Sequence, residues 1–256
     1  MKKINIDYIK NLKKTTTPFV SLTAYDYISA QILDQANIPL ILVGDSASMM
    51  IYGYDTTIPI TMDEMLLLVK AVSRGVNKAL VVADMPFLSY QPSTEETIKN
   101  AGRLIKDGGA GAVKLEGGVH VFDNIKALVD SGIPVLGHVG LTPQSYHQLS
   151  GYKIQGKSSQ GAAKIIEDSI AVQEGGAFGI VLECIPEALA TKITKKLAIP
   201  TIGIGSGITC DGQIQVLHDV LGLHKNDAPK HAIPCGNLYN DLLAMIKKYK
   251  SIVEKF

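Results

Sequence analysis

The chain has few cysteines, and their placement excludes two kinds of small, cross-linked fold. It contains three in 256 residues, Cys184, Cys210 and Cys235, with no C-x-x-C pair and no histidines at zinc spacing. An odd, widely spaced set of this kind disfavours both a disulfide framework and a structural zinc site. The sequence therefore predicts a protein of a reducing compartment, stabilised by a large core.

Charge of one sign and long apolar runs are also missing. Lys+Arg 25 against Asp+Glu 24 gives a formal net charge of +1, which provides no general attraction for nucleic acid or an anionic membrane. The longest apolar runs, such as residues 38–43, are far shorter than the roughly 18 residues that span a bilayer. The basic N-terminal segment never becomes the apolar stretch of a signal peptide. We expect a cytoplasmic protein that binds small molecules and binds neither nucleic acid nor a membrane.

What the sequence does contain is a repeat of roughly thirty residues. Short apolar runs rich in Val and Ile alternate with stretches of helical spacing. The runs cover residues 19–24, 39–44, 79–83, 112–115, 134–137, 179–182 and 200–204, with an eighth expected near 216–221. Because they are almost continuously apolar, they are typical of strands buried on both faces of a parallel sheet.

The stretches of helical spacing complete the repeat. They cover residues 27–36, 62–74, 94–106, 121–130, 160–174 and 187–197, and a basic amphipathic helix is expected over 241–256. A βα unit repeated seven or eight times in about 250 residues predicts an α/β fold, the (β/α)8 TIM barrel. We expect residues 1–256 to form a single barrel domain with a C-terminal helix. A doubly wound open sheet is the alternative.

Two aspartates follow apolar runs directly. Asp45 and Asp84 each stand where the chain leaves a predicted strand, and in a (β/α)8 barrel these positions build the active site. Convergent carboxylates suit a hard ion such as Mg²⁺, which leaves coordination positions open for a chelating substrate. One such aspartate alone would more often cap a helix or turn. The pair favours a metal site.

Four further ionisable residues lie at predicted strand ends. Lys114 and Glu116 alternate with apolar residues, so both point to the barrel interior, where they form a salt bridge or support anion and metal binding. Glu183 ends an apolar run that should partly desolvate it and raise its pKa towards that of a general base, unless it forms an ordinary salt bridge. His138 is either a hydrogen-bonded interior histidine or a contact to substrate.

These residues belong to an ordered series of motifs. The series is TAYD at 23–26, VGDS at 43–46, DMPF at 84–87, VKLEGG at 113–118, GHVGLTPQS at 137–145, LE at 182–183 and IPTIGIG at 199–205. In this order, over about residues 17–230, the motifs resemble those of the ketopantoate hydroxymethyltransferase family. An ordered set is far more specific than any one of its members.

The resemblance implies a (β/α)8 enzyme that requires Mg²⁺. Such an enzyme transfers a hydroxymethyl group from 5,10-methylenetetrahydrofolate to 3-methyl-2-oxobutanoate through a Mg-stabilised enolate. The product is 2-dehydropantoate, an intermediate of pantothenate and coenzyme A biosynthesis. The resemblance also implies a cytoplasmic homo-oligomer, usually a decamer.

The family's site residues fall on matching positions of this chain. The resemblance assigns the metal to Asp45, Asp84 and Glu116, the oxo-acid contacts to Asp45, Ser46, Asp84 and Lys114, and proton removal to Glu183. Two other functions stay open. One is a Mg-dependent lyase or mutase acting on another 2-oxo acid through the same enolate chemistry, because fold and metal site do not determine the electrophile. The other is a non-catalytic metabolite-binding barrel.

Overall fold

Eight parallel strands form a closed barrel in the computed structural model, which describes residues 3–224 and 229–256. The strands are β1 (Phe19–Thr23), β2 (Leu40–Val43), β3 (Leu80–Asp84), β4 (Ala112–Glu116), β5 (Val135–Gly140), β6 (Gly179–Glu183), β7 (Thr201–Ile204) and β8 (Gly212–Gln215). Strands consecutive in sequence are neighbours in the barrel. The TIM barrel is confirmed, and the open sheet is wrong.

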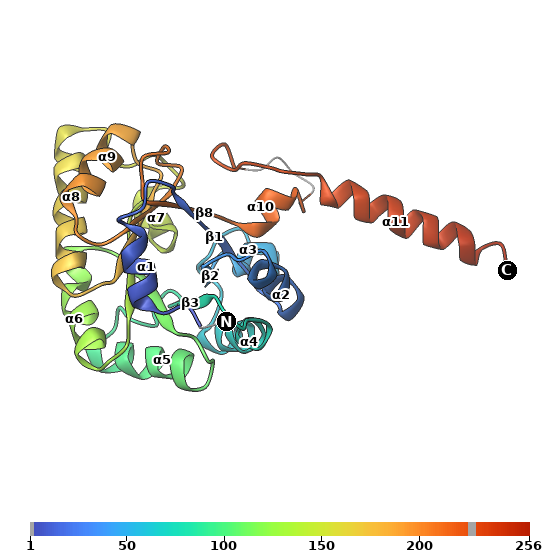
Figure 1. Ribbon diagram of the computed structural model, residues 1–256, viewed down its shortest axis with the longest axis horizontal. Coiled ribbons are helices and arrows are strands. Elements are labelled where there is room, and N and C mark those ends of the chain that lie inside the picture. The colour runs from blue at the N-terminus through green and yellow to red at the C-terminus, as the bar shows by residue number, and fades with distance from the viewer. Residues whose placement is uncertain (1–2, 225–228) are drawn as a thin grey trace. The chain divides into compact units, whose positions relative to one another are not determined.

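Helices between the strands surround the barrel (Figure 1). They are α2 (Tyr27–Gln35), α4 (Met62–Gly75), α5 (Thr94–Lys106), α6 (Phe122–Asp130), α8 (Ser159–Glu174) and α9 (Glu187–Lys196). Each end lies within one residue of its predicted position. Side-chain caps define the start of two of these helices. The Ser93 side chain accepts a hydrogen bond from the backbone N–H of Glu96 at the start of α5. Thr61 and Glu64 form a reciprocal capping box at α4.

The eighth strand differs from its prediction. It lies at Gly212–Gln215, and the expected position instead contains a short helix, α10 (Leu217–Leu221). The prediction near 216–221 is therefore wrong. In β8 the buried Gly212 and Ile214 alternate with half-buried glutamines. The strand consequently lacks the continuous apolar run by which the others could be found.

Short helices occur where the sequence shows no period. They are α1 (Ile6–Leu12), α3 (Ala47–Met50), α7 (Tyr146–Leu149) and the 3-10 turns η1 (Val119–Val121) and η2 (Pro143–Ser145). One or two turns are too short for a 3.6-residue pattern to repeat. α3, η2 and α7 lie in the long loops that follow β2 and β5. These loops are at the end of the barrel where the strands finish.

Along the strands, the barrel interior changes from an apolar lower part to an ionisable upper layer, which is nearer the C-terminal ends of the strands. α1 contributes Ile9 to a buried cluster with residues from the strands, including Leu80 and Val82 of β3. Alternate residues of a strand share a face, so the next inward-facing residue of β3 is Asp84. The same change from apolar to ionisable occurs from Ala112 to Lys114, from Leu136 to His138 and from Val181 to Glu183. The ionisable groups therefore lie directly above the apolar core.

The chain divides into two compact units, Met1–Ile214 and Gln215–Phe256. The first contains β1 to β7 and most of β8, and the second contains α10 and α11 (Leu238–Val253). α11 begins three residues before the basic amphipathic helix expected at 241–256. The expectation that residues 1–256 are one domain stays a prediction. No helix in the described part of the chain is both long and apolar enough to cross a membrane.

Close packing between β5 and α8 makes Gly137 sensitive to substitution. A Cβ atom at this position would lie 2.3 Å from Cγ1 of the buried Val172. Gly137→Ala should therefore lower the free energy of unfolding by about 1–3 kcal/mol. Gly102→Ala is the matched control: it has open space within α5 and should raise that free energy by up to about 1 kcal/mol. Urea denaturation measures both, and equal effects of the two substitutions would contradict the packing assignment.

Candidate active site

A row of alternating charges crosses four neighbouring strands at the end of the barrel. Lys114 Nζ on β4 donates a hydrogen bond to Asp84 Oδ1 on β3 at 2.6 Å. Glu116 Oε1 lies 3.9 Å from Lys114 Nζ and 3.5 Å from His138 Nδ1 on β5. His138 Nε2 lies 3.1 Å from Glu183 Oε2 on β6. The strand register produces this row, because Asp84 pairs with Lys114 and Glu116 pairs with His138.

Burial makes these charges depend on one another. Asp84, Lys114, Glu116 and His138 are each at most 3% exposed, and an unpaired ion in such a place costs several kcal/mol. Burial alone would lower the pKa of Lys114, but Asp84 and Glu116 raise it above its usual value. Burial and Lys114 also oppose the charge of His138, but contacts with Glu116 and Glu183 outweigh them and raise its pKa to about 9. Lys114 and His138 therefore both keep their positive charge at neutral pH.

Asp45 adds a further carboxylate beside this row. It follows β2, and its backbone N–H donates to Asp84 Oδ2 at 3.2 Å. Burial, together with Asp84 and Glu116, raises the pKa of Asp45 well above its usual value, and burial also raises that of Asp84. Within the described part of the chain, these two side chains accept hydrogen bonds from the backbone N–H of Asp45, from Lys114 and from Gln144, and not from a helix N-terminus. Three buried carboxylates therefore surround Lys114, and a further cation would reduce their repulsion.

The donor set suits a metal that is held partly by a substrate. Within residues 3–224 and 229–256, no three His, Cys, Asp or Glu side chains are arranged as a complete ligand set. Mg²⁺ does not require one, because it is commonly bound by one or two carboxylates together with waters and substrate oxygens. Asp45 and Asp84 offer such oxygens. Glu116 Oε1 also accepts no hydrogen bond from the described residues. These residues fit a divalent cation.

Ser46 and Glu183 lie at two sides of the same end of the barrel. Ser46 directly precedes α3, and its hydroxyl forms a 2.7 Å hydrogen bond with that of Tyr25. Glu183 is the last residue of β6, and its side chain is 14% exposed. Asp84 and Glu116, by contrast, have side chains only 2% exposed. Glu183 is therefore the most solvent-accessible of these three acids.

Two buried residues at the site were not singled out from the sequence. Gln144 in η2 donates from Nε2 to Asp45 Oδ2 at 3.0 Å and from its backbone N–H to Glu116 Oε2 at 3.1 Å. Tyr90 Oη donates to Gln144 Oε1 at 2.9 Å. Neither residue ends a strand or belongs to a periodic helix. Their only signal in the sequence is their place in or beside the motifs of the family.

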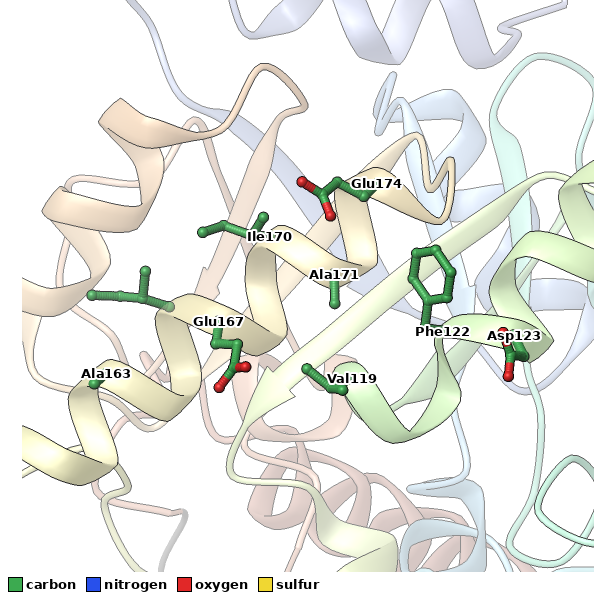
Figure 2. A pocket seen from close by; sticks show the side chains of 9 residues that line it. Val119, Phe122, Asp123, Ala163, Glu167, Ile170, Ala171 and Glu174 are labelled. Atoms are coloured by element: carbon green, nitrogen blue, oxygen red, sulfur yellow. The ribbon is translucent and has the colours of Figure 1, made fainter.

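A groove elsewhere on the barrel surface is separate from these residues. Figure 2 shows side chains of α8 facing those of η1 and the start of α6. Apolar Val119, Phe122 and Ile170 line this groove together with three acidic residues. It contains none of the candidate site residues. The outer groove is therefore not the candidate active site.

Fold and site together define a (β/α)8-barrel enzyme with ionisable groups at the ends of its strands. The fold is similar to phosphoenolpyruvate phosphomutase from Streptomyces platensis subsp. rosaceus, with a TM-score of 0.66 and 12% identity over 98% of this chain and 88% of that one. It is also similar to phosphonopyruvate hydrolase in complex with oxalate and Mg²⁺, with a TM-score of 0.65 and 13% identity over 85% of this chain and 81% of that one. At such identities the likeness shows the fold alone.

Sequence comparison identifies the family. The family model of ketopantoate hydroxymethyltransferase matches residues 3–256. A 3-methyl-2-oxobutanoate hydroxymethyltransferase of Dehalococcoides mccartyi (strain CBDB1) is 51% identical over 99% of this chain and 91% of its own length. One of Geobacter metallireducens is 50% identical over 99% of this chain and 95% of its own length. The chain belongs to the ketopantoate hydroxymethyltransferase family, whose members are enzymes with small-molecule substrates.

Family membership confirms the resemblance seen in the motifs. The lyase or mutase alternative is not favoured. The mutase and hydrolase structures share only 12–13% identity with this chain, far less than the relatives in the family. The non-catalytic barrel is not favoured either, since the relatives carry the names of enzymes.

The raised pKa of His138 predicts a pH-dependent contribution to stability. Its folded value of about 9 lies above the usual 6.5, so the stabilisation is fully present below pH 6.5 and is lost as the pH rises through 9. The free energy of unfolding of the metal-free parent, relative to His138→Gln, should fall by at most about 3 kcal/mol across that range. Denaturation at several pH values measures the difference.

His147→Gln is the control, because His147 lies on the exposed surface of α7, outside the row of charges. Its pH profile should follow that of the parent. Parallel profiles for the parent and His138→Gln would show that His138 does not hold its proton through the two carboxylates.

Proposed function

We propose that the protein transfers a hydroxymethyl group from 5,10-methylenetetrahydrofolate to 3-methyl-2-oxobutanoate and so forms 2-dehydropantoate. The observation that carries this proposal is the surplus of buried carboxylates around Lys114, next to the more accessible Glu183. Such a site suits an anionic substrate that brings a divalent cation with it. Relatives about 50% identical over nearly the whole chain carry the name of this activity.

Asp45 and Asp84 are the proposed ligands of Mg²⁺, and Glu116 supports them. When bound, Mg²⁺ supplies positive charge that stabilises the enolate of a 2-oxo acid. Lys114 is held as a cation by Asp84 and Glu116, so it can attract the substrate carboxylate. The Ser46 hydroxyl, fixed by its hydrogen bond to Tyr25, offers a further polar contact. Together these residues bind and orient the oxo acid.

Glu183 is the proposed acceptor of the proton on C3 of the oxo acid. Its carboxylate lies 3.1 Å from the imidazole of His138, which is positively charged at neutral pH because its pKa is raised to about 9. His138 therefore holds the carboxylate in place at the edge of the site. Loss of the proton leaves C3 as the carbon nucleophile that forms a bond to the methylene carbon of the folate. In the overall transfer both C–N bonds of that carbon break, water supplies the hydroxyl oxygen of the product, and tetrahydrofolate is released.

Family membership alone supports folate as the donor, because none of the contacts described here is specific for it. Mg²⁺ has independent support from the donor set described above. The cytoplasmic location and the decameric assembly expected from the resemblance stay predictions.

Incubation of the purified protein with Mg²⁺, 3-methyl-2-oxobutanoate and 5,10-methylenetetrahydrofolate should produce 2-dehydropantoate, which mass spectrometry detects. Asp84→Asn should lower the rate about 100-fold or more, because it removes a charge that acts on both the metal and Lys114. Asp63→Asn is the control, since the Asp63 side chain is 82% exposed on α4, and it should keep the parent rate.

Two other outcomes would contradict the proposal. Consumption of the oxo acid without any folate would indicate a lyase or mutase. Binding of the oxo acid with no turnover under any of these conditions would indicate a non-catalytic barrel.

A further inference from the structure

Gln144 connects the ends of three strands at the candidate site. Its Nε2 donates to Asp45 Oδ2 at 3.0 Å and to the carbonyl oxygen of Met85 at 2.9 Å. Its backbone N–H donates to Glu116 Oε2 at 3.1 Å. These three partners follow or end β2, β3 and β4, and Gln144 itself is only 3% exposed. One residue of the β5 loop, through its side chain and its backbone N–H, therefore contacts residues that lie far away in the sequence.

The chemistry of its partners determines the orientation of the Gln144 amide. A backbone carbonyl can only accept hydrogen bonds, so the NH2 group must face Met85, and the carboxylate of Asp45 requires the same. The opposite side, Oε1, accepts from Tyr90 Oη at 2.9 Å. Tyr90 Oη in turn accepts from the backbone N–H of Glu116 at 3.2 Å. Only one orientation of the Gln144 amide therefore satisfies all of these hydrogen-bond partners.

The Asp45 carboxylate needs such support because its neighbours repel it. It is buried beside Asp84 and Glu116, and Lys114, the nearby cation, forms its hydrogen bond with Asp84. The described hydrogen bond to an Asp45 carboxylate oxygen comes from Gln144. Without it, Asp45 can rotate away from the other acids, which lowers the repulsion but also removes its oxygens from the proposed metal position.

We propose that Gln144 is a positioning residue that holds the Asp45 carboxylate ready for the metal and the 2-oxo acid. This inference rests on the proposed function for the identity of these ligands. Gln144 acts through Asp45 and Glu116, and the hydrogen bonds that it donates go to these two residues and to Met85, not to Glu183. Its effect should therefore fall on binding and not on proton removal.

Calorimetric titration with MgCl2 alone tests the metal part. Gln144→Met keeps the length of the side chain and the backbone bond to Glu116 but loses the amide, so it should weaken Mg²⁺ binding about 10-fold. Tyr90→Phe keeps the amide and removes the hydroxyl that orients it, which also accepts from the backbone N–H of Glu116, so a smaller loss in the same direction is expected. If Gln144→Met does not fold, Tyr90→Phe still tests whether the orientation of the amide affects Mg²⁺ binding.

Gln173→Met is the matched control. The Gln173 side chain also ties a loop to the barrel, since its Oε1 accepts from the backbone N–H groups of Ala198 and Ile199, but it lies in α8, away from the carboxylates. It should lower the melting temperature and leave Mg²⁺ binding unchanged. A purely structural role for Gln144 would give the same pattern.

A split between KM and kcat tests the substrate part. Gln144→Met should raise KM for the oxo acid about 10-fold, while kcat at saturating Mg²⁺ and oxo acid stays within about threefold of the parent. Mg²⁺ affinity unchanged in both Gln144→Met and Tyr90→Phe, or a parent protein that does not bind Mg²⁺, would overturn the proposal. If the parent binds Mg²⁺ but forms no product, the proposed function fails, and the Mg²⁺ titrations still decide the role of Gln144.

Discussion

The buried ion pair between Asp84 and Lys114 is the interaction on which the rest of the site depends. It lies across β3 and β4 with both side chains at most 4% exposed, so loss of either partner leaves an uncompensated charge that costs about 3–5 kcal/mol. Lys114 also offsets part of the repulsion among Asp45, Asp84 and Glu116. Without this cation the barrel could not keep three carboxylates together above an apolar core.

Along the strands of the barrel, apolar residues that stabilise the core are followed by ionisable residues at the candidate site. Its lower residues, such as Leu80 and Val82, belong to a buried apolar cluster, whereas Asp84, the next inward-facing residue of β3, is ionisable. The net charge of +1 gives no long-range attraction for an anionic substrate. Selectivity for such a substrate must therefore come from local charges at the strand ends. Gln144 and Tyr90 add neutral hydrogen bonds that orient those charges without changing their sum.

Sequence patterns were sufficient where the signal is local. Apolar runs located β1 to β7, helical spacing located the six helices between them, and the alternation around Lys114 placed two ionisable residues on one face of a strand. They failed for β8, whose glutamines interrupt the apolar run, and for Gln144, whose bond to Asp45 joins residues 99 positions apart. No local period records such a contact. The proposed roles of Asp45, Asp84 and Glu183 rest on strand ends and the family motifs together.

Exchange of the C3 proton of 3-methyl-2-oxobutanoate with solvent deuterium, followed by NMR in the absence of folate, is the most direct measurement of the central claim. We expect exchange that requires Mg²⁺ and is lost in Glu183→Gln, although this variant still binds Mg²⁺ and the oxo acid. Exchange at the parent rate in Glu183→Gln, or no exchange in the parent with both ligands bound, would contradict it.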